Sequence, residues 1–311
     1  METLINGLHH VTALASDTLR NVDFYRTFLG LRLLKKTVNF DAPDVYHLYY
    51  GDETGSPGSI LTFFPYGAIP RGRRGAGQLT YTAFSVPVAS MPFWLDRLQH
   101  AQIAHSVPAQ RFGETFVQFD DPDGMGLELV FTDADTRPAY AQGPVPAAFA
   151  IHGFHTVALL SAQPDRTADL LTGVMQHRLL AQEGNRARYV AGAGGPGNFV
   201  DIQTPTETVR ALQGAGSVHH LAFSTDTDQT ELLIQEQLRE AGYQVTPVQD
   251  RNYFHSIYFR EPGGVLFEVA TNPPGFAIDE PLETLGTSLM LPPQYEARRA
   301  QLEQVLPVIS A

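Results

Sequence analysis

The sequence predicts an α+β protein in which four modules of one β-α-β-β-β plan form two cup-shaped sheets, each from a pair of modules. An alternating strand pattern, an amphipathic stretch and further strand patterns follow one another four times within 311 residues. The closing strands of the second and fourth modules align without a gap, because Pro122 and Pro262, like Glu128 and Glu268, are 140 residues apart. This offset indicates duplication, although unrelated α+β proteins also contain strand-helix-strand segments.

The first half, residues 1–145, contains modules at 6–66 and 77–132. The first module opens with the alternating run LHHVTALASD, continues with the amphipathic segment DTLRNVDFYRTFLG, which Gly30 ends, and closes with strands VYHLYYGD and GSILTFFP. The second opens with QLTYTAFSVP, has a helix around MPFWLDRLQHAQ and closes with TFVQFDDPDGMGLELVF. Both therefore repeat the order strand, helix, strands.

The second half, residues 146–274, repeats the plan at 152–206 and 216–272. Its modules open with GFHTVALLSA and VHHLAFSTDT, have helices across DRTADLLTGVMQ and QTELLIQEQLREAG, and close with strands RYVAG and NFVDIQTP, and with SIYFREPGGVLFEVAT. Between the halves, the Pro- and Ala-rich stretch TDADTRPAYAQGPVPAAFA indicates a linker and a boundary near residue 145. A tail, 275–311, is expected to pack on the body and to end in a helix across QYEARRAQLEQVL.

Composition excludes several classes of function. Hydrophobic residues at 43% and charged residues at 17% indicate a folded protein. The net charge of -12 disfavours nucleic acid and anionic membrane surfaces as partners. With no cysteine, any metal must be held by His, Asp, Glu or water. No signal peptide or membrane span is evident, so a cytoplasmic location is expected. Phosphate-binding glycine loops, GxSxG and HExxH are absent from the sequence.

Two histidine doublets open the first and fourth modules, His9-His10 and His219-His220. Each doublet lies in a predicted strand, so one histidine should face inward and the other away. A lone strand histidine is usually structural, but two doublets at equivalent places in a repeat favour a shared function.

A register argument selects three ligands. When the first strands of the four modules are aligned, equivalent positions hold His10, Tyr81, Thr156 and His220. When the last strands are aligned, equivalent positions hold Thr62, Glu128, Asp201 and Glu268. Among the module pairs considered, the first with the fourth offers two histidines and one carboxylate, namely His10, His220 and Glu268. This set suits non-heme Fe(II) with open positions for substrate and O₂, although Mn(II) binds the same ligands. It requires the first module to exchange its partner and join the last.

The sequence resembles the vicinal oxygen chelate superfamily, which includes glyoxalases, bleomycin resistance proteins and extradiol dioxygenases. More narrowly, it resembles the bacterial dioxygenases that open hydroquinones and chlorohydroquinones. The resemblance covers nearly the whole chain and is carried by LHHVT at 8–12, YHLYYGDETGSPG at 46–58, LTFFP at 61–65, EGNR at 183–186, VHHLAF at 218–223, YFREPGGVLFEVAT at 258–271 and LGTSLMLPPQYE in the tail. It implies the paired-module cup and, as iron ligands, His10, His220 and Glu268.

The resemblance also implies further catalytic residues. His9 and Thr12 match on the first strand, Arg251 in QDRNY and Tyr258 in the last hairpin. Three of them have an ordinary structural alternative: Arg251 as a surface charge, Tyr258 as a half-buried strand aromatic and Thr12 as a common strand residue. His255 has no matching role.

The expected activity is cleavage of a hydroquinone-type ring by Fe(II) and O₂, with His9 or a Tyr258 phenolate as base and Arg251 stabilising charge. Three alternatives stay open: an extradiol catechol dioxygenase, a glyoxalase-like lyase or isomerase, and a protein that sequesters quinones. Thr62 disfavours the glyoxalase alternative, because those enzymes normally have a fourth protein ligand there. Glu128 and Glu261 are expected to be structural or solvent-facing, and a homo-oligomer is possible.

Overall fold

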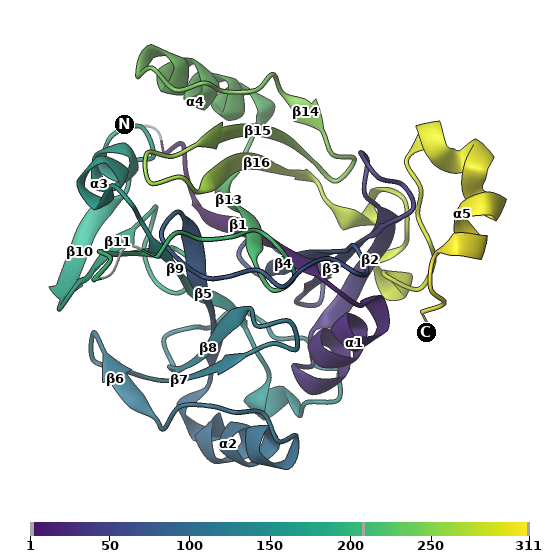
Figure 1. Ribbon diagram of the computed structural model, residues 1–311, viewed down its shortest axis with the longest axis horizontal. Coiled ribbons are helices and arrows are strands. Elements are labelled where there is room, and N and C mark those ends of the chain that lie inside the picture. The colour runs from purple at the N-terminus through teal and green to yellow at the C-terminus, as the bar shows by residue number, and fades with distance from the viewer. Residues whose placement is uncertain (1–2, 207–208, 310–311) are drawn as a thin grey trace.

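Two curled sheets of eight strands each dominate the protein, and short helices lie around them (Figure 1). The structure, a computed structural model, describes residues 3–206 and 209–309. The predicted fold class, four modules in two paired cup-shaped sheets, is confirmed. Within the described ranges, no helix is long and apolar enough to cross a membrane.

The first sheet combines the first and fourth modules. In spatial order its strands are β14 (Gln249–Asp250), β15 (Phe254–Arg260), β16 (Leu266–Pro274), β13 (Val218–Thr225), β1 (Gly7–Ala15), β4 (Ile60–Pro65), β3 (Tyr46–Gly51) and β2 (Arg32–Val38). Strands β1 and β13 pair antiparallel at its centre. The sheet order therefore contains the exchange of partners that the register argument required.

The second sheet combines the second and third modules. Its strands, in spatial order, are β10 (Arg178–Glu183), β11 (Arg186–Val190), β12 (Phe199–Gln203), β9 (Gly153–Leu160), β5 (Gln78–Val86), β8 (Gly126–Phe131), β7 (Glu114–Asp120) and β6 (Ala109–Arg111). Each sheet contains one module from each half of the sequence. The boundary near residue 145 therefore separates the two halves of the sequence, and its role as a domain boundary stays a prediction.

Helices follow the first strand of every module. They are α1 (Thr18–Val22) with the π-helical turn η1 (Asp23–Phe28), α2 (Met91–His100) after the turn η2 (Val88–Ser90), α3 (Pro164–Thr172) and α4 (Asp228–Glu240). The segment at 17–30 is thus not one regular helix: the Leu29 amide bonds to the Phe24 carbonyl, five residues back. This wider turn accompanies burial of both Phe24 and Tyr25.

The tail packs on the first sheet, as expected. It contains the 3-10 turns η4 (Phe276–Ile278), η5 (Leu282–Thr284) and η6 (Pro293–Arg298), followed by α5 (Arg299–Val305), while η3 (Ala147–Phe149) lies in the linker. The fully buried Lys35 of β2 binds Asp279 at 2.7 Å and Glu280 at 2.9 Å. The Tyr295 hydroxyl donates to the Phe40 carbonyl at 2.6 Å. These contacts hold the loop after β2 in place.

The apolar core has two parts. A large cluster fills the space between the strands and the surrounding helices, and strand β1 is buried along its whole length. A smaller cluster lies on the other face of the first sheet and comprises Leu34, Tyr49, Ile60, Ala222, Tyr253, Phe254, Ala270, Phe276 and Leu285. Burying such side chains typically contributes about 1.5–3 kcal/mol each, so this cluster gives the first cup a rigid floor.

Candidate metal centre

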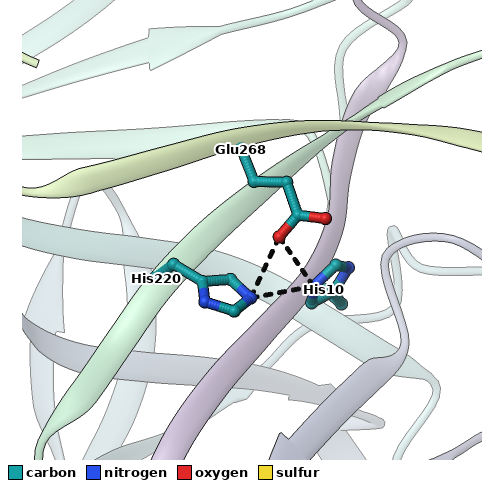
Figure 2. Close-up of side chains that lie close together, drawn as sticks. All are labelled: His10, His220 and Glu268. Atoms are coloured by element: carbon teal, nitrogen blue, oxygen red, sulfur yellow. Dashed lines mark hydrogen bonds and ion pairs between the residues drawn. The ribbon is translucent and has the colours of Figure 1, made fainter. Parts of the chain in front are cut away.

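His10, His220 and Glu268 meet on three adjacent strands in the middle of the first sheet (Figure 2). The Nε2 atoms of the two histidines are 3.2 Å apart. The Glu268 Oε2 atom lies 3.3 Å from His10 Nε2 and 3.0 Å from His220 Nε2. All three residues are buried. The structure therefore brings together the three residues that the sequence analysis selected.

The strand register explains this meeting. Ala222 on β13 is paired with His10 on β1 and also with Glu268 on β16. His220 lies two residues before Ala222, so it is on the same face of the sheet. Because alanine has a small side chain, the three longer side chains can converge above it.

The donor set fits a metal ion. One carboxylate oxygen of Glu268 accepts from the Ser256 hydroxyl, whereas Oε2 is buried and has no hydrogen-bond partner among the described residues. Bond lengths of about 2.1 Å place ligand atoms about 3.0 Å apart at a right angle and about 3.4 Å apart at a tetrahedral angle. The three separations fall in this range. The group is therefore suited to binding a metal ion.

The charge of Glu268 supports the same conclusion. Burial alone raises the pKa of this carboxyl, but His10 and His220 outweigh burial and hold the pKa well below its ordinary value. Burial also lowers the pKa of His220, even though Glu268 acts in the opposite direction. An anionic carboxylate beside neutral imidazoles is the form in which these residues bind metals.

Both histidine doublets lie at β-bulges, and the expectation that one ring faces inward and the other away is wrong. The pairing of β1 with β13 shifts between Leu8 and His10, which leaves His9 as an extra residue. On β13 the extra residue is His219. In each doublet the two Nδ1 atoms are 2.8 Å apart, so the rings contact each other.

These contacts assign the tautomers. His10 Nε2 faces the other ligands and must carry a lone pair to bind a metal, so its Nδ1–H donates to His9 Nδ1. Burial, and then His10, lower the pKa of His9 to about 3. His9 is thus a neutral acceptor behind His10, and its predicted part in catalysis becomes a proposal that it orients His10. Burial and His220 likewise lower the pKa of His219 to about 4.

A cavity of about 510 Å³ opens over the triad, and Arg251 and Tyr258 line it. Tyr258 is paired with Glu268 across β15 and β16, and its hydroxyl accepts from Arg251 Nε at 3.1 Å. Burial and Glu268 raise the pKa of Tyr258 far above its ordinary value. The structure therefore favours a protonated Tyr258 that donates a hydrogen bond, rather than the phenolate base suggested by the sequence analysis.

Thr12 lies below the cavity in a chain of hydrogen bonds. Its hydroxyl is 2.9 Å from that of Thr62, which is also 2.9 Å from His47 Nε2. His47 Nδ1 is 2.8 Å from the Tyr49 hydroxyl. The Thr62 hydroxyl bonds to Thr12 and His47. Thr62 occupies the position where glyoxalases have a fourth metal ligand, and here its hydroxyl is used by these two hydrogen bonds. Sequence reasoning missed His47 and Tyr49, both of which line the cavity.

The remaining candidates lie elsewhere. His255 lies where the pairing of β15 with β16 shifts, with the extra residues on β16, and its Nδ1 is 2.7 Å from Asp228 on helix α4. Glu261 accepts from the amides of Gly263 and Val265, so it is structural, as expected.

The second cup has ion pairs at the corresponding places. Fully buried Glu128 binds Arg111, and fully buried Asp201 binds Arg186 and Arg188 at distances down to 2.8 Å. Within the described ranges, His10, His220 and Glu268 are the group of three with ligand atoms close enough to hold a metal. In the second cup, arginine guanidinium groups thus neutralise the buried carboxylates. In the first cup, a bound metal cation would neutralise Glu268.

Comparisons with known proteins agree with this geometry. The pattern of the Glyoxalase/Bleomycin resistance protein/Dioxygenase superfamily matches residues 7–129 and 141–269. A Bacillus subtilis protein named "Putative ring-cleaving dioxygenase MhqO" is 48% identical over 96% of this chain and 95% of its own. The "Chlorohydroquinone/hydroquinone 1,2-dioxygenase" of Sphingobium indicum is 34% identical over 96% of this chain and 95% of its own. The chain therefore belongs to the Glyoxalase/Bleomycin resistance protein/Dioxygenase superfamily.

Solved structures extend the comparison. A crystal structure of a Bacillus subtilis protein described as a "putative dioxygenase" superposes with a TM-score of 0.95 at 46% identity, covering 99% of both chains. Glyoxalase I of Zea mays superposes with a TM-score of 0.64 at 14% identity, covering 86% of this chain and 92% of the enzyme. The second likeness shows a shared fold.

Proposed function

We propose that the protein is an Fe(II)-dependent dioxygenase that opens a hydroquinone-type aromatic ring with O₂. The observation that carries the proposal is the buried group of His10, His220 and Glu268 under a cavity. Two histidines and one carboxylate are the ligand set of non-heme Fe(II) oxygenases, which leave positions open for substrate and O₂. Mn(II) is the second candidate metal, because it accepts the same ligands. The names of the relatives MhqO and the Sphingobium enzyme support ring cleavage.

A bound Fe(II) would supply the redox chemistry that lets O₂ react with an aromatic ring, and the protein would supply charge and position. Two neutral imidazoles and one carboxylate leave a divalent ion with a net positive charge, which attracts a phenolate oxygen.

The cavity wall presents hydrogen-bond donors to such a substrate. Tyr258 accepts from Arg251 and stays protonated, so its O–H can serve as a donor. Burial lowers the pKa of Arg251, but Tyr258 and Glu268 outweigh burial and keep the guanidinium charged. The His219 ring, neutral and accepting from His220 through Nδ1, carries its proton on Nε2. Donors and a fixed cation stabilise negative charge that develops on substrate oxygens during reaction.

Oxygen uptake tests the proposal. Protein loaded anaerobically with Fe(II) is given hydroquinone, methylhydroquinone, chlorohydroquinone, catechol or the methylglyoxal-glutathione adduct, with His220→Ala as the control. We expect uptake with the hydroquinones and its loss in the control. Uptake with catechol alone would instead favour an extradiol enzyme, and isomerisation of the adduct would favour a glyoxalase. Bound iron without uptake on any diol would overturn the dioxygenase assignment.

A further inference from the structure

We propose that Tyr49, held by His47, binds the second hydroxyl of a para-diol and so makes the cavity selective for that class of substrate. The inference rests on the proposed function, because it names the part of the site that recognises the far side of the ring. Neither residue belongs to the group of three candidate ligands, and the hydrogen bonds given for them do not involve Arg251 or Tyr258.

The module repeat gives the first argument. Tyr49 on β3 is paired with Thr62 on β4, just as Tyr258 on β15 is paired with Glu268 on β16. Thr62 and Glu268 occupy equivalent positions in the first and fourth modules. Tyr49 is therefore the counterpart of Tyr258, and the two tyrosines lie on opposite sides of the triad in the sheet order.

Each tyrosine has a basic side chain on its hydroxyl. For Tyr258 this is Arg251, at 3.1 Å, and for Tyr49 it is His47, at 2.8 Å. Burial, then His10 and His220, lower the pKa of His47 well below its ordinary value. The imidazole is therefore neutral, with one nitrogen donating and the other accepting between Thr62 and Tyr49. In either direction of this chain, the Tyr49 hydroxyl retains a hydrogen-bonding position for a ligand.

The Tyr49 ring is fixed before any ligand binds. The residue is 1% exposed, and its ring packs edge-on against Phe276 at 5.2 Å and Tyr253 at 5.8 Å between centroids. Tyr49 and His47 line the same cavity as His10 and His220. A hydroxyl that is already oriented loses little freedom on binding, so its hydrogen bond adds to affinity and to selectivity.

The distance across the sheet suggests a para-diol. Strand β3 is two strands away from β1, which carries His10, and neighbouring strands lie about 4.8 Å apart. In the proposed orientation the ring extends from the triad toward β3, and a para hydroxyl is then the one that comes nearest Tyr49. With ortho hydroxyls, the second oxygen stays beside the first, at the triad.

The test compares two ligands that differ by one hydroxyl. Dissociation constants for hydroquinone and phenol are measured by anaerobic titration calorimetry on the Fe(II)-loaded protein. Tyr49→Phe should weaken hydroquinone binding about three- to tenfold, the effect of one hydrogen bond, and leave phenol binding unchanged. His47→Gln is the second variant and should shift the same ratio. Tyr50→Phe is the matched control, because Tyr50 is the next residue of β3 and bonds to Asn21 on the other face.

Equal weakening of both ligands, or no change in either, would overturn the inference. The result is separable from the fate of the proposed function. A selective loss of hydroquinone affinity without oxygen uptake would support the subsite while the dioxygenase assignment fails. Oxygen uptake with an unchanged hydroquinone-to-phenol ratio in both variants would overturn the subsite alone.

Discussion

Individual carboxylates in this protein owe their roles to their neighbours. Glu268 and Glu128 occupy equivalent positions on β16 and β8, and both are fully buried. Glu268 faces two imidazole nitrogens, whereas Glu128 faces the guanidinium of Arg111. The same side chain is thus a candidate metal ligand in one cup and half of an ion pair in the other.

Replacing Glu268 by Gln tests the charge of the triad. Glu268→Gln keeps the shape but removes the anion, so we expect metal retained after desalting to fall well below one ion per chain. We expect oxygen uptake to fall at least about 100-fold, since the acquisition of metal depends on a deprotonated ligand. Elemental analysis and oxygen uptake measure the two effects. Glu296→Gln, at an exposed position in η6, is the control, and full metal retention in Glu268→Gln would contradict the assignment.

The sequence sufficed for the triad because His10, His220 and Glu268 are unusual residues at equivalent places in a repeat. The sequence did not suffice for Tyr49, because tyrosines are common in strands. The role of Tyr49 depends on its position relative to the triad, which follows from the order of strands in the sheet. Extending the register comparison by one strand would have shown that Tyr49 and Tyr258 are equivalent.

Irregularities in the strands were the least predictable elements. An extra residue in a strand leaves no clear mark in a hydrophobic pattern, so the bulges at His9 and His219 could not be foreseen. Each of them changes the direction of a histidine. The helices were located correctly, because caps such as Asp17 and Thr227 and regular apolar spacing mark them.

The connection after helix α3 carries a group that is sensitive to acid. His177 is buried, its Nδ1 bonds to the Met175 carbonyl at 2.7 Å, and its Nε2 has no partner within the described ranges. Burial lowers its pKa to about 4 from 6.5. The unfolded chain therefore binds this proton more readily, and the contribution of His177 to stability is lost as the pH falls from 6.5 towards 4.

His177→Gln should make the protein less sensitive to this change. Between pH 7 and pH 5 the wild type should lose about 1–2 kcal/mol of unfolding free energy more than the variant loses, since each pKa unit is worth about 1.36 kcal/mol. Urea unfolding at the two pH values measures the difference. Equal losses would show that the pKa of His177 is not lowered in the folded protein.

At the scale of the whole molecule, the two cups are alternative solutions for the same backbone. The first cup places two histidines and one carboxylate under a cavity. The second cup neutralises its buried carboxylates with arginines. The exchange of modules between the sheets could be predicted by comparing the ligands that each module pair offers. The arginine pairs could not, because Arg111, Arg186 and Arg188 were not included in that comparison, although each lies within 17 residues of its carboxylate.

Arg111→Met tests the structural role of the second cup. The side chain of Arg111 is 11% exposed and that of Glu128 is not exposed, so the variant leaves a buried carboxylate without its main partner. We expect a loss of about 3–5 kcal/mol in unfolding free energy, as for other broken buried pairs. Metal content should stay unchanged, because the first cup is not touched. Denaturant titration and elemental analysis test both statements, and a loss of metal from a folded variant would contradict them.

The pairing of β1 with β13 has a consequence for biosynthesis. Strand β1 ends at Ala15 and its partner β13 ends at Thr225. During synthesis, about 210 further residues must therefore be added before β1 can pair with β13. At roughly 5–20 residues per second this is about 10–40 s. The second sheet can be completed within that interval, since its last strand in the chain ends at Gln203. Glu268 is synthesised later still, so the triad can form only after the chain has reached this residue.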